Sequence, residues 1–130
     1  MLSLALPGRV FLCATPTDMR KSFDGLSAVV REHLNQDPLA GDLFVFRNRR
    51  GDRLKLLYWD EDGYAIWYKR LEEGVFAFPD ATHRRGVPGG EHGLPMRAAD
   101  LAMLLDGVDL ASVRRGKRYQ RPAQQRAASA

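Results

Sequence analysis

The chain has 130 residues, of which 45% are hydrophobic and 28% charged. This length suits one domain with a buried core, and this composition excludes an intrinsically disordered chain. No stretch reaches the roughly 18 consecutive apolar residues that a membrane-spanning helix needs, so we expect no membrane partner. The first residues carry too short an apolar run and too little positive charge for a signal peptide, and the single cysteine, Cys13, excludes an internal disulfide. We therefore expect a cytoplasmic protein.

Positive charge is concentrated in two parts of the chain, although the net charge is only +4. Residues 107–130 hold six basic residues and one acid, and residues 43–59 hold five basic residues and one acid. Two such basic clusters favour a polyanionic partner, which indicates nucleic acid. A solvated tail and a solubilising turn would carry the same charges, so charge alone leaves both interpretations open.

The N-terminal part predicts a strand followed by a helix. Residues 9–14 are apolar and rich in β-formers, and Pro16 closes this run, which indicates a strand. Apolar residues from Met19 to Leu34 then recur at spacings of three and four, which predicts a helix over 18–35.

Residues 43–78 predict an antiparallel β-meander of about four strands, at 43–47, 53–59, 64–70 and 75–78. The inner turns at 48–51 and 60–63 each begin with Asn or Asp and end with Gly, which predicts three-residue loops with a left-handed glycine.

The register that follows from these turns sorts the side chains onto two faces. One face is predicted to be the core, and its members are Phe44, Phe46, Leu54, Leu56, Tyr58, Tyr64, Ile66 and Tyr68. The other face is predicted to be basic and aromatic, and its members are Val45, Arg47, Arg53, Lys55, Leu57, Trp59, Trp67 and Lys69.

The C-terminal part predicts a loop, a helix and a tail. Residues 79–95 contain four Gly and three Pro and predict a flexible loop, which a helix over 96–106 follows. We expect one α+β domain over 1–113: an antiparallel β-meander of about four strands, an N-terminal helix on one face and a C-terminal helix after the Gly/Pro-rich loop. Residues 114–130 are predicted to form a basic, disordered tail.

Motifs for catalysis or tight metal binding are absent from the sequence, including GxSxG, phosphate-binding loops and CxxC. The pair Asp60 and Asp62 would suit a divalent cation, but Asp-x-Asp-Gly is also a favoured β-turn sequence. We therefore expect no enzyme, no metal and no cofactor. A metal-dependent nuclease fragment that uses Asp60 and Asp62 is the weaker alternative.

The basic and aromatic face of the predicted sheet is the main candidate for a binding surface. Exposed Trp59 and Trp67 would stack on bases, and the neighbouring Lys55 and Lys69 would neutralise phosphates. The alternative is that the helix over 96–106 covers this face and the lysines reach past it to solvent. At the tip of the hairpin, Arg49 and Arg50 can enter a groove or contact phosphates.

Three long segments resemble one known family. Residues 43–78 read LFVFRNRRGDRLKLLYWDEDGYAIWYKRLEEGVFAF, residues 17–30 read TDMRKSFDGLSAVV, and residues 101–110 read LAMLLDGVDL. In this order they resemble the signature blocks of TnpB, the accessory protein from the second open reading frame of insertion-sequence family 66. The resemblance implies an accessory factor for transposition, with no established catalytic activity, that acts beside a separate transposase. It also marks a basic and aromatic block: Arg47, Arg49, Lys55, Trp59, Trp67, Lys69 and Arg70.

We therefore expect a protein that assists transposition by binding DNA at the ends of the element, the transposase and other proteins of the element, or both. The alternative is a protein–protein adaptor for the transposase with no direct contact to DNA. The predicted contact residues are Arg47, Arg49, Arg50, Arg53, Lys55, Trp59, Trp67, Lys69, Arg70, Arg114, Arg115, Lys117 and Arg118.

Overall fold

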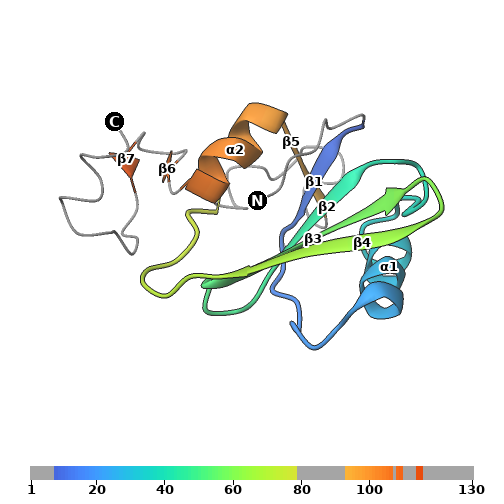
Figure 1. Ribbon diagram of the computed structural model, residues 1–130, viewed down its shortest axis with the longest axis horizontal. Helices are drawn as coiled ribbons and strands as arrows, with labels where there is room; N and C mark the ends of the chain where they lie inside the picture. The colour runs from blue at the N-terminus through green and yellow to red at the C-terminus, as the bar shows by residue number, and fades with distance from the viewer. Residues whose placement is uncertain (1–7, 79–92, 107, 110–113, 116–130) are drawn as a thin grey trace.

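The computed structural model describes residues 8–78, 93–106, 108–109 and 114–115. Its centre is a five-stranded sheet in the order β4-β3-β2-β1-β5, with helix α1 against one face and helix α2 against the other (Figure 1). All neighbouring strands are antiparallel except β1 and β2, which are parallel. The elements are β1 Val10–Cys13, α1 Phe23–Glu32, β2 Leu43–Arg47, β3 Arg53–Asp60, β4 Gly63–Arg70, β5 Gly93–Met96 and α2 Ala98–Asp106. The α+β fold with an N-terminal and a C-terminal helix is confirmed.

Both faces of the sheet are buried, and the described residues form two apolar clusters, one on each face. On the α1 side, Leu26 and Val30 of the helix pack on Phe44 and Leu57 of the sheet. On the α2 side, Leu101 and other residues of that helix pack on the opposite faces of β2 and β3. Because apolar side chains point both ways from β1 and β2, these two strands read as nearly continuous apolar runs, whereas β3 begins with Arg53 and Lys55 in alternation with leucines.

The predicted register of the hairpins was wrong by one residue at each turn. Phe46 lies opposite Lys55 rather than Leu54, and Leu57 lies opposite Ile66. One-residue shifts exchange the faces of a strand. The first shift exchanges the faces of β3 relative to β2, and the second exchanges the faces of β4 relative to β3. The side chains of β4 therefore lie on the predicted side of the sheet, and only those of β3 lie on the opposite side from the prediction. Therefore Phe44 and Phe46 face α1, whereas the even-numbered side chains of β3 that were predicted to join them face α2.

The cause lies in the two turns. In the first turn, Gly51 adopts the predicted left-handed conformation with φ 79°, but the Asn48 amide donates to the Arg53 carbonyl, so Asp52 is an additional loop residue. In the second turn, Asp60 lies opposite Gly63, which leaves a two-residue loop, and Glu61 rather than Gly63 takes the positive φ, at 56°.

Two segments outside the inner strands also differ from the prediction. Residues 75–78 form no strand; instead, Phe76 buries its side chain in the α2-side cluster and its amide donates to the Gly51 carbonyl at 2.8 Å. Gly93–Met96, which lies partly in the predicted loop, forms β5 instead, and Leu94 and Met96 are buried. Its Pro95 is tolerated because β5 is an edge strand.

The two helices begin later than predicted. Residues 18–22 precede α1 as a loop, and α2 begins at Ala98. Beyond α2, Val108–Asp109 (β6) pairs with Arg114–Arg115 (β7). Residues 79–92 and 116–130 lie outside the described residues, so the loop, the domain boundary and the disordered tail remain predictions. Neither helix of the described part is long and apolar enough to cross a membrane.

The first turn yields a testable prediction. Gly51→Ala is expected to destabilise the protein by about 1–2 kcal/mol, the cost of a left-handed conformation for an L-residue with a side chain. Space is not the cause, since the new Cβ would lie 3.5 Å from the nearest atom of Val75, an ordinary contact. Gly63→Ala is the matched control: no positive φ is recorded there and no atom lies within 4 Å. Urea unfolding measures both, and equal losses would contradict the prediction.

Candidate functional site

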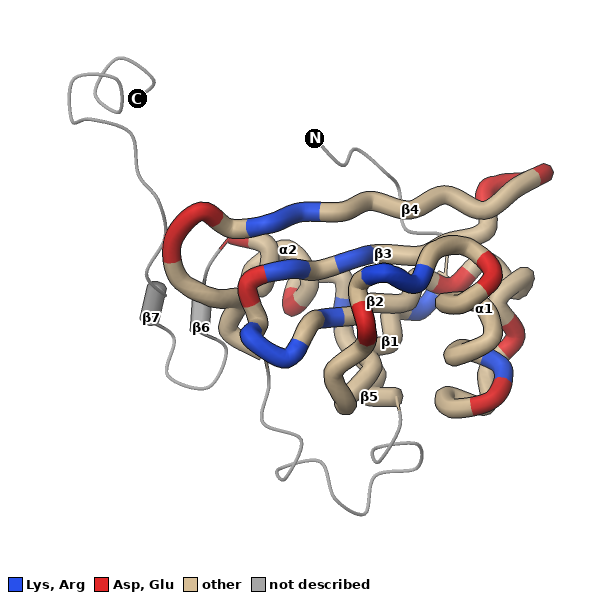
Figure 2. The backbone as a smooth tube through the Cα atoms, turned by 90° about the horizontal axis from the view of Figure 1, so that it is seen from below, with Lys and Arg blue, Asp and Glu red and all other residues tan. Residues whose placement is uncertain are grey.

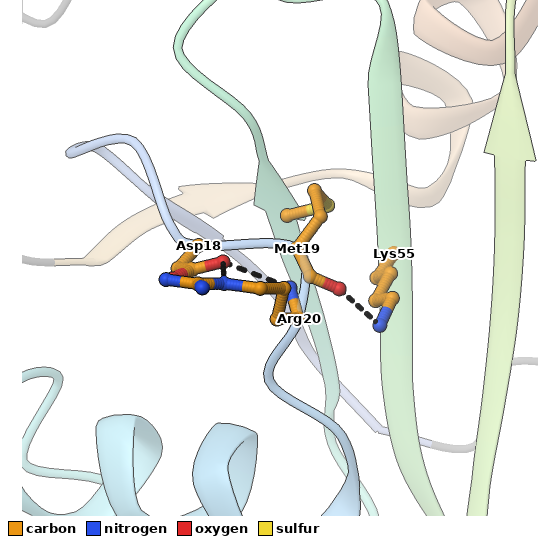
Figure 3. Close-up of polar contacts among 4 residues, drawn as sticks. All are labelled: Asp18, Met19, Arg20 and Lys55. Carbon is orange, nitrogen blue, oxygen red and sulfur yellow. Dashed lines mark hydrogen bonds and ion pairs between the residues drawn. The ribbon is translucent and has the colours of Figure 1, made fainter.

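Lys55 fastens the loop before α1 onto the sheet. Its side chain is 7% exposed, although it carries a charge. The ammonium Nζ donates to the Met19 carbonyl at 2.8 Å (Figure 3). It also donates to the Lys21 carbonyl at 2.8 Å and lies 4.7 Å from the centroid of the Tyr68 ring. These contacts compensate the burial of the charge, because a buried ammonium without hydrogen bonds would cost several kcal/mol. Lys55 is therefore a positioning residue and not part of an open surface.

The loop held by Lys55 carries an ion pair. Arg20 donates from Nε and Nη2 to the Asp18 carboxylate, with the shortest distance at 2.7 Å (Figure 3). The hydrogen bonds from Arg20 lower the pKa of Asp18 to about 2. The preceding residue, Thr17, donates its amide to the Arg47 carbonyl at 2.7 Å, so this loop passes beside the end of β2.

Between this loop and the β2–β3 turn lies a groove of about 570 Å³, which we name the arginine groove. The charged and aromatic residues that line it are Asp18, Arg20, Arg49, Arg50, Asp52, Arg53 and Tyr68. Four guanidinium groups against two carboxylates leave a positive charge in the groove. Figure 2 shows Lys and Arg positions, in blue, gathered along β3 and on the neighbouring loops.

The two carboxylates of the groove stay ionised at neutral pH, and each already accepts a hydrogen bond from a neighbouring side chain. The side-chain amide of Asn48 donates to Asp52 at 2.6 Å, and this bond together with the charges of Arg50 and Arg53 lowers the pKa of Asp52. By contrast, Arg49 and Arg50 are exposed and make no hydrogen bond or ion pair with any residue in the described ranges. Their guanidinium groups are available to an anion, which they suit because they can form bidentate bonds to phosphate.

Tyr68 forms the aromatic part of the groove. It is 46% exposed, and Arg53 donates from Nη1 to its hydroxyl at 3.3 Å. Together with Lys55 beneath the ring, this hydrogen bond fixes the position of the Tyr68 side chain. An exposed, fixed ring beside guanidinium groups can stack on a base or a sugar while the arginines contact a backbone.

The predicted basic and aromatic face does not exist as one surface. Because β3 is turned over, Lys55 and Trp59 face the α1 side, whereas Trp67 and Lys69 face the α2 side. Both tryptophans are half-buried: Trp67 packs on the α2-side cluster, and Trp59 meets the Tyr64 ring edge-on at 5.1 Å.

Of the other predicted contact residues, Arg47 is engaged within the fold. Its Nη2 donates to the Ala14 carbonyl at 3.0 Å, its guanidinium lies 5.3 Å from the Phe78 ring, and burial lowers its pKa. Arg70 forms an exposed ion pair with Glu72.

The remaining predicted contact residues have no described side chains. Arg114 and Arg115 form β7, of which only the backbone is described, and Lys117 and Arg118 lie outside the described residues. Asp60 and Asp62, the residues of the nuclease alternative, sit on the β3–β4 turn, at the opposite end of β3 from the arginine groove.

Of the charged and aromatic residues of the groove, sequence reasoning missed four: Asp18, Arg20, Asp52 and Tyr68. The first two were placed inside a predicted helix, and Tyr68 was placed in the core. The available signal was Ser22, a residue type favoured at helix N-caps. It occupies the N-cap of α1, although its side chain makes no capping hydrogen bond, and the helix therefore begins at Phe23 and leaves Arg20 outside.

The ion pair at Asp18 gives a pH-dependent prediction. The folded pKa of Asp18, about 2, lies below its ordinary value of 3.8. The pair therefore favours the folded loop above pH 3.8, and this contribution is lost as the pH falls through the folded pKa. In an NMR titration, the Asp18 carboxyl is expected to titrate near pH 2 in the wild type and closer to its ordinary range in Arg20→Gln. An unchanged pKa in that variant would contradict the assignment.

The fold and the groove define a small, basic α+β protein. The chain matches the family model described as IS66 Orf2-like protein over residues 8–115, and it belongs to that family. Members of this family are accessory proteins of an insertion sequence, so the resemblance seen in the sequence is confirmed and indicates a role in transposition.

Two similar proteins come from Sinorhizobium fredii (strain NBRC 101917 / NGR234). The protein described as uncharacterized protein y4jC is 38% identical over 114 residues, which cover 88% of this chain and 90% of that protein. Uncharacterized protein y4hO is 40% identical over 101 residues, covering 78% of this chain and 81% of that protein. No solved structure matches the chain.

Proposed function

We propose that this protein assists transposition by binding the phosphate backbone of DNA in the arginine groove. The observation that carries the proposal is the convergence of Arg20, Arg49, Arg50 and Arg53 on one hollow. Guanidinium groups bind phosphate with paired, charge-assisted hydrogen bonds, and release of counterions from DNA adds to the affinity.

Contacts within the protein hold the two walls of the groove in place without a ligand, and this favours binding. Lys55 holds one wall by two hydrogen bonds to the backbone, and Asp18 holds the Arg20 side chain. On the other wall, the left-handed Gly51 shapes the turn that presents Arg49 and Arg50. A fixed site loses less conformational entropy on binding than a flexible one. The basic residues after 113 would add contacts that are not sequence-specific.

The second candidate function is an adaptor that binds the transposase without touching DNA. It is supported by the same exposed guanidinium groups, which would also fit a carboxylate-rich protein surface. The two functions differ in their ligand. The first requires that the groove binds DNA in the absence of other proteins, whereas the second requires binding to the transposase.

The test is fluorescence anisotropy with element-end DNA and random DNA between about 50 and 200 mM salt, a range over which phosphate binding weakens steeply. The double variant Arg49→Gln/Arg50→Gln is expected to bind about tenfold more weakly and to reduce the log–log salt slope by about 1.8, or about 0.9 for each phosphate that is no longer neutralised. The matched control is Arg31→Gln/Lys69→Gln, which removes the same charge from positions outside the groove.

Equal losses in the two double variants would show that net charge rather than the groove binds DNA, and would overturn the proposal. Absence of DNA binding at low salt, combined with co-purification of the transposase that the groove variant abolishes, would establish the adaptor function instead. Preference for element ends over random DNA would be read from the ratio of the two affinities at one salt concentration.

A further inference from the structure

We infer that the arginine groove takes an unpaired DNA strand rather than a duplex, with one base stacked on Tyr68 and the neighbouring phosphates held by Arg49 and Arg50. This inference rests on the proposed function, because it names the form of DNA that the same groove binds. Three features of the groove support it: its volume, the Tyr68 ring and the way its arginines are engaged.

The volume of the groove suits a nucleotide better than a duplex. Pockets of roughly 300–1,000 Å³ hold small ligands. The arginine groove, at about 570 Å³, falls within this range. A DNA duplex is far larger, since its major groove alone is about 12 Å wide and admits a whole helix. A duplex can therefore lie only across the mouth of the groove, whereas nucleotides of a single strand can enter it.

The Tyr68 ring provides a stacking surface in the groove. The buried Lys55 places its ammonium over one face of the ring, 4.7 Å from the centroid. The Tyr68 side chain is nevertheless 46% exposed and lines the groove, so its exposed surface lies away from Lys55. In a duplex the neighbouring base pairs cover both faces of each internal base. Only an unpaired or unstacked base can therefore stack on Tyr68.

Arg53 joins the ring to the cationic part of the groove. Its Nη1 donates to the Tyr68 hydroxyl at 3.3 Å, so the ring lies directly beside a guanidinium group. A base stacked on Tyr68 consequently has its sugar and phosphate close to positive charge. An aromatic platform beside a basic path for the backbone is typical of proteins that bind single strands.

The arginines of the groove are not equivalent as phosphate ligands. Arg20 is already bonded through Nε and Nη2 to the Asp18 carboxylate, whose negative charge disfavours a phosphate at that position. Arg49 and Arg50 are exposed and have no hydrogen bond or ion pair to the residues that the structure describes. Asp52 of the same turn offsets only part of their charge. The phosphates are therefore expected at the tip of the β2–β3 hairpin.

The test compares a single strand with a blunt duplex of the same sequence, by fluorescence anisotropy with the full chain at one low salt concentration. Attraction to phosphates alone favours the duplex, because its charge density is higher. Stacking is expected to reverse this order, so that the wild type binds the single strand about tenfold more tightly than the duplex. A duplex that binds as tightly as the single strand would overturn the inference. Tighter binding of an RNA strand of the same sequence would overturn the assignment to DNA.

Substitutions of Tyr68 test the stacking contact. Tyr68→Leu is expected to remove the preference for the single strand, whereas Tyr68→Phe retains the ring and is expected to keep the single-strand affinity within about threefold of the wild type. Phe23→Leu is the matched control, since Phe23 is 45% exposed but does not line the groove. Circular dichroism confirms that each variant is folded. An unchanged preference in Tyr68→Leu, or an equal loss in Phe23→Leu, would overturn the inference.

Failure of this inference can be distinguished from failure of the proposed function. Suppose that Arg49→Gln/Arg50→Gln weakens DNA binding more than Arg31→Gln/Lys69→Gln does, but that the wild type binds both forms of DNA alike. The groove then binds DNA, and the stacked base on Tyr68 is wrong. If the two double variants lose affinity equally, the groove is not the binding site and both proposals are wrong.

Discussion

Lys55→Met is expected to destabilise the protein by about 2 kcal/mol, the range for losing a hydrogen bond from a charged group and leaving its acceptors unsatisfied. The methionine retains most of the buried apolar stem, so the loss reports the ammonium and its bonds to the Met19 and Lys21 carbonyls. A second effect is expected on function. Lys55 does not line the arginine groove, yet its loss releases the loop that carries Arg20, so DNA affinity should fall as well.

Lys69→Met is the matched control for this change. Lys69 lies on the neighbouring strand and is exposed, so the same substitution is expected to alter stability by less than about 0.5 kcal/mol. Urea unfolding followed by tryptophan fluorescence measures both variants. If Lys55→Met were as stable as Lys69→Met, the ammonium would not hold the loop, contrary to the role assigned to it in the groove wall.

Phe44→Ala is expected to have the largest effect on stability, about 3–5 kcal/mol, as for other large aromatic residues truncated in a core. The Phe44 side chain is 0% exposed on β2, and its ring stacks on Phe11 of β1 at 5.8 Å between centroids. Truncation would leave a cavity beneath α1 that the surrounding strands cannot close, because they are paired on both sides.

Phe23→Ala removes the same side chain from the first residue of α1. Because Phe23 is 45% exposed, we expect a loss below about 1 kcal/mol, as is usual for surface substitutions. Thermal unfolding by circular dichroism compares the two variants. Similar losses would show that the α1-side cluster is not the core that the structure describes.

The strands at the centre of the chain could be predicted from the sequence, but their faces could not. The apolar runs of β1 to β4 and the turn residues between them mark each element locally. However, Leu54, Leu56 and Leu57 are all buried, and they point to both sides of β3. The basic Arg53 and Lys55 share a face of β3 with the buried Leu57, so the side-chain pattern does not show which face of β3 lies on the same side as Phe44. The register therefore depended on turn geometry that the sequence left ambiguous.

Only those parts of the candidate site that depend on local sequence signals could be predicted. Arg49 and Arg50 were identified correctly as a hairpin tip, because a turn signal is local. Lys55 was predicted to be a surface cation, since its hydrogen-bond acceptors lie more than 30 residues away in sequence and no local pattern indicates them. Tyr68 was predicted to be a core residue, and this prediction was wrong. It lies near the end of β4, where it is 46% exposed and lines the groove beside the turn arginines.

The sequence by itself determined the family, the α+β class, the positions of four strands and the two concentrations of positive charge, since each of these depends on local composition and spacing. Tertiary structure alone decided that β1 and β5 complete the sheet, that both faces are covered, that Lys55 is buried and that Arg20 joins the hairpin arginines in one groove. These features depend on contacts between residues far apart in the chain, and a shift of one residue in hydrogen-bond register is enough to change which side chains meet.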